Sequence, residues 1–142
     1  MKTAYSTITF RYVHDVVTGE FANIGVVLHA PEQRYLGARF SSSCDRIKRM
    51  FNQVDEIHYL AALEHLQARF SEVAANMQTT TAPIPAGWLL EIVQQVLPSD
   101  DSSLQWSSAF VGFTDDPEKT LQQVYTRLVE RYAPPARNAA LT

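Results

Sequence analysis

Residues 23–29 read Asn-Ile-Gly-Val-Val-Leu-His, and the architecture can be worked out from this segment. Apolar and β-branched residues dominate it, and turn-forming residues stand on either side, at Gly19 and Pro31. This composition predicts a β-strand whose side chains alternate between two faces. Ile24, Val26 and Leu28 are then expected to face the core, and Gly25, Val27 and His29 the other side.

Two more strands are expected beside this segment. Residues 4–13 (AYSTITFRYV) alternate between apolar and polar positions, which is typical of a half-buried strand. Residues 34–40 (RYLGARF) follow a break at residues 31–33 and place Leu36, Ala38 and Phe40 on one side. Because the connections are short, we predict an antiparallel meander with residues 23–29 in the middle.

Parity predicts the register of this meander. Residues directly opposite each other share a face, so residues 24, 26 and 28 are expected to pair with residues 40, 38 and 36. This pairing needs a loop of odd length, which Pro31-Glu32-Gln33 supplies. Arg39 would then lie opposite Gly25, and Arg11 opposite either Gly25 or Asn23.

Helical periodicity replaces strand alternation after residue 40. A short helix is expected from the serines at residues 41–43, which can cap its start, to Phe51. A long helix follows at about residues 54–77, and its apolar positions form one stripe. The stripe consists of Tyr59, Leu63, Leu66, Phe70, Val73 and Met77. A third helix is expected over residues 87–97.

A fourth strand and a last helix complete the predicted architecture. Residues 106–113 (WSSAFVGF) have the composition of a strand, and the acidic residues and proline at residues 115–118 favour a helix start. The expected fold class is α+β: a small antiparallel sheet, formed by the three-stranded N-terminal meander plus a fourth strand, with helices packed on one face. We expect one domain over residues 1–133 and a flexible C-terminal tail over residues 134–142.

Length and composition disfavour several protein classes. The 142 residues suit one domain, and a single cysteine cannot form an internal disulfide. The N-terminus lacks the basic and apolar regions of a signal peptide, and no apolar run approaches the ~20 residues of a membrane helix. The net charge of −3 disfavours nucleic-acid binding. We therefore expect a cytoplasmic protein without a membrane segment.

The outward face of the predicted sheet is the main candidate binding surface. Arg11 and Arg39 would flank Gly25 there. Two guanidinium groups beside a glycine suit a phosphate, a carboxylate or an acidic side chain of a partner. The alternative is an ordinary solvated sheet face, on which the arginine stems cover the glycine.

A second polar cluster is expected at the first turn, where Asp15, Glu20 and Asn23 lie. Two carboxylates near arginines suit acid–base chemistry or a metal ion. The alternative, which we favour, is turn formation, with Asp15 and Asn23 bonded to their own backbone and Glu20 paired with Arg11. The complete set of candidate binding residues is Arg11, Asp15, Glu20, Asn23, Gly25 and Arg39.

No catalytic residue, metal site or cofactor is predicted. Cys44 lies at the start of a helix but has no histidine near it in the sequence, so a buried thiol is favoured. His58 and His65 are seven residues apart, whereas metal-binding pairs on helices lie about four apart. The sequence also lacks a Gly-rich phosphate loop, a nucleophile elbow and a paired-cysteine zinc pattern.

One pattern resembles a known family. Residues 11–28 carry Arg11-Tyr12-Val13, Asp15 and Gly19-Glu20-Phe21 ahead of the segment Asn23-Ile24-Gly25-Val26-Val27-Leu28. Together with residues 36–40 and 115–118, this pattern resembles the bacterial family DUF3037, a domain of unknown function, over roughly residues 5–132. The resemblance brings no assigned activity. It implies a bacterial protein encoded beside kinases similar to HipA, so a HipA-like kinase is a candidate partner.

Two functional hypotheses follow. The first is a non-enzymatic protein-interaction module that binds a partner through the open sheet face or a sheet edge. The second is a small-molecule or anion-binding domain, with or without enzymatic activity, that uses Arg11 and Arg39. We favour the first, because no catalytic constellation is recognisable. An exposed strand edge also leaves homo-oligomerisation open.

Overall fold

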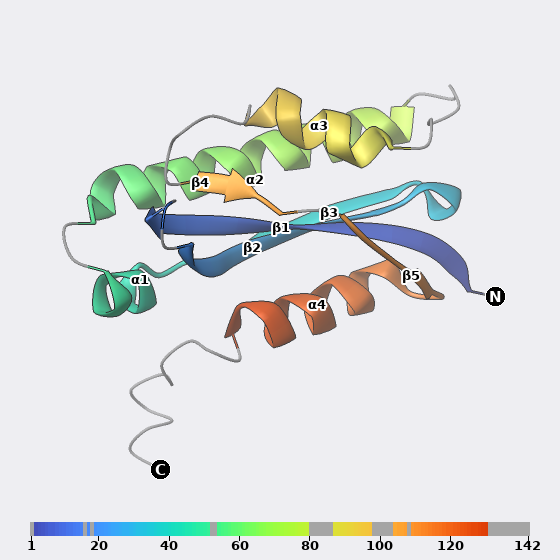
Figure 1. The fold of residues 1–142 in the computed structure, drawn as a ribbon. Helices are drawn as coiled ribbons and strands as arrows, with labels where there is room; N and C mark the ends of the chain where they lie inside the picture. Colours follow the sequence, from blue (N-terminus) through green and yellow to red (C-terminus); the bar gives the residue numbers. More distant parts are fainter. Residues whose placement is uncertain are drawn as a thin grey trace, which may run out of the picture.

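A computed structural model describes residues 2–15, 17, 19–51, 54–79, 87–97, 104–107 and 109–130 of the chain. The strands are β1 (Thr3–Asp15), β2 (Glu20–Ala30), β3 (Tyr35–Phe40), β4 (Leu104–Trp106) and β5 (Phe110–Thr114). The helices are α1 (Asp45–Met50), α2 (Glu56–Thr79), α3 (Trp88–Val96) and α4 (Pro117–Leu128), with a short 3-10 turn, η1, at Pro31–Gln33 (Figure 1). The predicted α+β class is confirmed.

All strands join one antiparallel sheet. Its order is β3-β2-β1-β4, and β5 also pairs with β1, so the predicted meander with β2 in the middle is confirmed. The predicted fourth strand over residues 106–113 is instead two short strands. β4 pairs with residues 10–12 of β1 and β5 with residues 3–7, so both lie along the same side of β1.

The predicted register of β2 and β3 is wrong by one residue. Gly25 pairs with Phe40, and Arg39 lies opposite Val26 rather than opposite Gly25. The loop explains the difference, because Ala30 still belongs to β2 and pairs with Tyr35. Arg34 closes the connection in a left-handed conformation at φ 50°, and its N–H donates to the carbonyl of Pro31 at 3.1 Å. The loop therefore holds an even number of residues.

A β-bulge changes which side chains of β2 share a face. Phe10 of β1 pairs with Gly25, but the next residue, Arg11, pairs with Asn23, so Ile24 is an extra residue on β2. Ile24 and Val27 consequently point into the same core. Strict alternation, which assumes no such insertion, placed Val27 outward, and that prediction is wrong.

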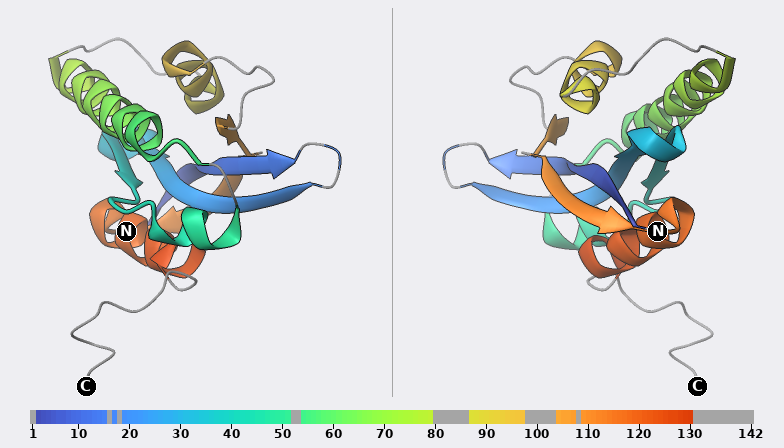
Figure 2. Two further views of the ribbon diagram at one scale, coloured as in Figure 1. Left: turned by 90° about the vertical axis from the view of Figure 1, so that its left-hand side faces the viewer. Right: turned by 90° about the vertical axis from the view of Figure 1, so that its right-hand side faces the viewer.

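Helices cover both faces of the sheet. One core lies between the sheet and α2 and α3, and the other lies between the sheet and α4 (Figure 1; Figure 2). Val26, Leu28 and Ala30 of β2 meet α4 residues in the second core. The prediction of helices on one face and an open opposite face is therefore wrong. The sequence contains a sign of the second covered face, because residues 26–28 are apolar without interruption, which is typical of a strand buried on both faces.

The helices otherwise follow the predicted pattern. The buried residues of α2 are Tyr59, Leu63, Leu66, Phe70 and Met77, all from the predicted stripe. In front of α1, the Ser43 hydroxyl accepts a hydrogen bond from the N–H of Asp45 at 3.1 Å. No described helix is both long and apolar enough to cross a membrane. The predicted flexible tail at residues 134–142 lies outside the described part of the chain.

Candidate functional site

The outer edge of β3 carries backbone groups that no strand in the described part of the chain uses. β3 is the first strand of the sheet order, so β2 lies on one side of it only. The Ser41 N–H donates to the carbonyl of Ile24 at 2.8 Å, which sets the alternation of the antiparallel pair. The backbone groups of Tyr35, Gly37 and Arg39 therefore face β2. Those of Leu36, Ala38 and Phe40 point outward.

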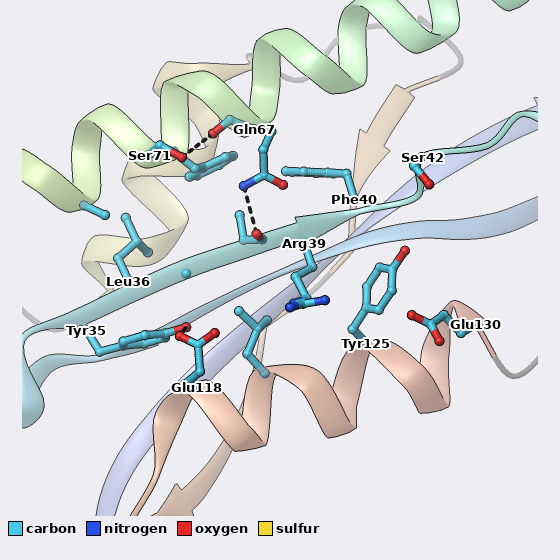
Figure 3. A pocket seen from close by; sticks show the side chains of 15 residues that line it. Tyr35, Leu36, Arg39, Phe40, Ser42, Gln67, Ser71, Glu118, Tyr125 and Glu130 are labelled. Atoms are coloured by element: carbon cyan, nitrogen blue, oxygen red, sulfur yellow. Dashed lines mark hydrogen bonds between the residues drawn. The ribbon is translucent and has the colours of Figure 1, made fainter.

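A groove of about 570 Å³ lies along this edge, between α2 and α4. Figure 3 shows β3 across the middle of the groove, with α2 on one side and α4 on the other. From α2, the Gln67 side-chain amide donates to the outward carbonyl of Ala38 at 2.9 Å. Phe70 and Ala74 form the apolar part of the same wall. The strand edge is thus the floor of an open groove.

Two tyrosines line the α4 side of the groove, Tyr35 from β3 and Tyr125 from α4, and each lies beside a carboxylate. The Tyr35 hydroxyl donates to Glu118 Oε2 at 3.2 Å. Burial, followed by the nearby Glu118 carboxylate, raises the pKa of Tyr35 to about 12. Burial, followed by the Glu130 carboxylate, also raises the pKa of Tyr125. Both hydroxyl groups therefore keep their protons at neutral pH and remain hydrogen-bond donors.

Arg39 projects between these two tyrosines (Figure 3). Its side chain is exposed, and no hydrogen bond or ion pair joins it to any residue that the structure describes. The corrected register places it opposite Val26, on the α4 side of the sheet. An arginine in this position can offer two parallel N–H donors, along one edge of its planar guanidinium group, to a carboxylate or phosphate.

Gly37 allows the groove to have this shape. A Cβ atom at this position would lie 2.8 Å from Cδ2 of Leu121 and closer still to the Tyr35 hydroxyl. The Tyr35 ring therefore lies across the glycine, where a side chain would otherwise stand. This placement brings the Tyr35 hydroxyl to Glu118, so the glycine positions the polar wall of the groove.

Arg11 and Asn23 lie opposite each other, which is one of the two predicted arrangements. The guanidinium carbon of Arg11 is 4.2 Å from the centroid of the Phe21 ring, a cation–π contact. Arg11 Nε and Asn23 Oδ1 are buried without a hydrogen-bond partner in the described structure. Arg11 does not line the groove, so the structure does not bring Arg11 and Arg39 into one pocket.

Gly25 is buried and does not lie on an open face of the sheet. Phe10 and Phe40 flank it from the two neighbouring strands, and their rings meet edge to face with centroids 5.7 Å apart. A Cβ at Gly25 would overlap the Phe40 ring. The glycine thus lets two aromatic residues meet in the core, and a role for Gly25 in ligand binding stays a prediction.

The first-turn cluster lies apart from the groove. Glu20 is exposed at the start of β2, and the backbone of Asp15 pairs with it. The side chain of Asp15 lies outside the described structure. Of the predicted binding residues whose side chains are described, Arg39 lines the groove. The functional roles of the others stay predictions.

The sequence did not point to the α4 side of the groove. The last helix was expected from residues 115–118, but it was not expected to cover a second face of the sheet. The signal that could have revealed it is the uninterrupted apolar run in β2, because a strand without a polar face needs cover on both sides. Glu118 and Glu130 carry no separate signal, since exposed acidic residues are common on helices.

Cys44 and His58 show no arrangement for catalysis. The Cys44 side chain is buried, as predicted, and burial raises the pKa of its thiol. His58 contacts the carboxylate of Asp55, and both side chains are exposed. Within the described ranges, no three His, Cys, Asp or Glu side chains are grouped to hold a metal ion.

Comparison with known proteins gives one match. The family model described as "Protein of unknown function (DUF3037)" matches residues 5–129, which is most of the chain. Searches among curated proteins and among solved structures found no significant match. The family match agrees with the resemblance carried by residues 11–28. The chain is therefore a member of the DUF3037 family.

Proposed function

We propose that this protein is an interaction domain that binds an extended segment of a partner protein along the edge of β3. The observation that carries the proposal is the combination of outward-facing backbone groups on β3 with an unpaired arginine, Arg39, in the same groove. Addition of a strand to an exposed edge is a recurring mode of peptide recognition. Main-chain hydrogen bonds supply affinity in this mode, and alternate side chains supply specificity.

The two walls of the groove define the segment that would fit. Side chains of an added strand alternate between the two faces of the sheet, as those of β3 do. Residues of the partner on the α4 side meet Arg39 and the Tyr125 hydroxyl, which suit an acidic side chain. Residues on the α2 side meet Phe70 and Ala74, which suit a small or apolar side chain. The expected motif alternates acidic and apolar residues.

Gln67 occupies part of the binding site in the free protein. Its side-chain amide donates to the Ala38 carbonyl, which is one of the outward groups of the edge. A backbone N–H of the added strand takes over this role, and Gln67 then swings aside within the groove. The glutamine therefore keeps the carbonyl satisfied until a partner arrives, because an unpaired buried carbonyl is costly.

The family resemblance offers one candidate for the partner, a kinase similar to HipA. A bacterial setting follows from the same resemblance, and the cytoplasmic location expected from the sequence belongs to the same proposal. The groove requires only that the partner present an extended segment with an acidic residue. The alternative function, binding of a small anion, draws support from Arg39 and the neighbouring Tyr125 hydroxyl.

Selection from a random peptide library, with the purified protein as bait, tests the proposal. We expect selected peptides to alternate acidic and apolar residues and to bind at least tenfold more weakly to Arg39→Glu. Arg127→Glu is the matched control, because it makes the same charge change at an exposed position of α4 outside the groove. A peptide with Lys in place of its acidic residue should recover binding to Arg39→Glu.

Two outcomes would contradict the proposal. Peptides that bind wild type and Arg39→Glu equally well would remove Arg39 from the interface. A failure to select any peptide, together with thermal stabilisation by inorganic phosphate or a small dicarboxylate that Arg39→Glu abolishes, would instead support the anion-binding alternative.

A further inference from the structure

The outer side of β5 is an exposed apolar edge. β5 pairs with β1 on one side, and no described strand lies on its other side. Figure 2 (right) shows it at the front of the molecule, where no described helix crosses it. Phe110, Val111 and Phe113 are exposed to 63%, 73% and 70%. Such a concentration of exposed apolar side chains within one strand is typical of an interface.

The backbone of β5 is positioned to pair with another strand. The N–H of Ser107 donates to the Thr9 carbonyl at 2.8 Å, and the Thr9 N–H donates to the Ser107 hydroxyl at 2.9 Å. Thr9 therefore directs its backbone groups to the β4 and β5 side of β1, and so do Thr7 and Tyr5 by alternation. Tyr5 pairs with Gly112, so Gly112 bonds inward. The backbone groups of Val111 and Phe113 consequently point outward.

The usual safeguards of an exposed edge are missing from β5. Natural edge strands commonly carry a lysine, a proline or a bulge that prevents pairing with another chain. Residues 110–114 read Phe-Val-Gly-Phe-Thr and contain no charge and no proline. The pairing of β5 with β1 has no register shift, so no bulge interrupts it. The edge is therefore open to pairing.

We propose that two copies of this chain pair through β5 in an antiparallel dimer with two-fold symmetry. With Gly112 facing Gly112 at the axis, Val111 of each copy lies opposite Phe113 of the other. These are the two residues whose backbone groups point outward, so both pairs can exchange hydrogen bonds. Their side chains share one face and form aromatic–β-branched pairs, which stabilise antiparallel strands.

A second copy satisfies both outward-facing residues of this edge without opposing charges. In a two-fold antiparallel pair, the numbers of opposing residues add up to a constant. With Gly112 opposite Gly112, Val111 is opposite Phe113 on both sides of the axis, so both outward-facing residues are paired. No charges oppose each other across this axis, because β5 has none. The contact is isologous and closes after two copies. It also lies on the opposite side of the sheet from β3, so the groove stays accessible in the dimer.

Sedimentation velocity over a hundredfold concentration range tests the dimer. We expect wild-type protein to shift from monomer to dimer as its concentration rises, and Phe113→Lys to remain monomeric throughout. Ile57→Lys is the control, because Ile57 on α2 is 81% exposed and its replacement removes a similar apolar surface away from β5. Wild-type protein that stays monomeric would overturn the proposal, as would a dimer that Phe113→Lys does not weaken.

Cysteine crosslinking tests the register. Val111→Cys and Phe113→Cys are made as separate variants, mixed and oxidised. The mixture should form disulfide-linked dimers joining the two variants, because these positions lie opposite each other, whereas each variant alone should crosslink far less. Cys44 is buried and should not react. Equal crosslinking of either variant alone, or none in the mixture, would contradict the register.

Discussion

At the scale of single residues, His29 links folding to pH. Its side chain is 4% exposed, its ring lies 4.6 Å from the Trp88 ring, and its Nε2 has no hydrogen-bond partner in the described structure. Burial lowers the pKa of His29 from 6.5 to about 4. Between these two pH values the unfolded chain binds the proton more readily than the folded chain. The free energy of unfolding therefore rises with pH in this window.

We predict that His29 makes the protein lose on the order of 3 kcal/mol of stability as the pH falls from about 6.5 to 4. Urea unfolding at several pH values measures this loss. His29→Phe keeps a ring against Trp88 but cannot take up a proton, so its stability should fall less over the same range. Equal pH dependence in the two proteins would show that His29 is not buried as an uncharged residue.

Gly25 makes a second prediction at this scale. A Cβ at this position would overlap the Phe40 ring, so Gly25→Ala should destabilise the protein by about 1–3 kcal/mol, the usual cost of overpacking a core. Denaturant unfolding measures the change. In a double-mutant cycle, Phe40→Leu should relieve part of the cost, since it removes the atoms that the new methyl group meets. Strictly additive effects would contradict the proposed contact.

At the scale of elements, α4 decides whether the sheet has one core or two. Leu121 is 2% exposed and belongs to the core on the second face. Leu121→Ala should therefore cost about 2–5 kcal/mol, as expected for a buried leucine. Gln123→Ala on the exposed side of the same helix is the control and should change stability little. A small effect of Leu121→Ala in thermal or denaturant unfolding would mean that α4 does not form a true core.

An N-cap that the sequence pattern at residues 115–118 predicts stabilises the start of α4. Asp116 precedes Pro117, and its carboxylate accepts a hydrogen bond from the Lys119 N–H at 3.2 Å. Asp116→Ala should cost about 1 kcal/mol, the typical value for loss of an N-cap. Asp116→Asn should cost much less, because the amide oxygen can accept the same bond. Unfolding curves of the two variants give the comparison.

Local patterns predicted most elements but not how they combine. The stripe on α2 and the acidic start of α4 follow from periodicity and capping, which act within one helix. The extra residue Ile24 changed which side chains of β2 share a face, and the loop closed by the left-handed Arg34 changed the register of β2 and β3. Neither feature can be recognised from sequence periodicity. Arg39 was therefore identified correctly as a polar residue of β3 but placed beside the wrong neighbours. The groove also needs α4, which comes from a distant part of the chain.

At the scale of the whole molecule, helices cover the two sheet faces, and the edges at β3 and β5 have no further described strand beside them. The β3 edge is polar, lies in a groove and carries the unpaired Arg39. The β5 edge is apolar and lacks charges. This division suits two different tasks, recognition of a partner segment at one edge and self-association at the other. Each edge can be altered without touching the other.

Hydrogen exchange of the β3 amide protons, measured by NMR with a library-selected peptide, tests whether a partner segment adds to the edge of β3. In the free protein, the N–H groups of Leu36, Ala38 and Phe40 should exchange faster than those of Tyr35, Gly37 and Arg39, which face β2. We predict that the peptide slows exchange at the first three residues, because their N–H groups gain partners. Unchanged exchange along β3, with protection appearing elsewhere on the protein, would contradict strand addition at this edge.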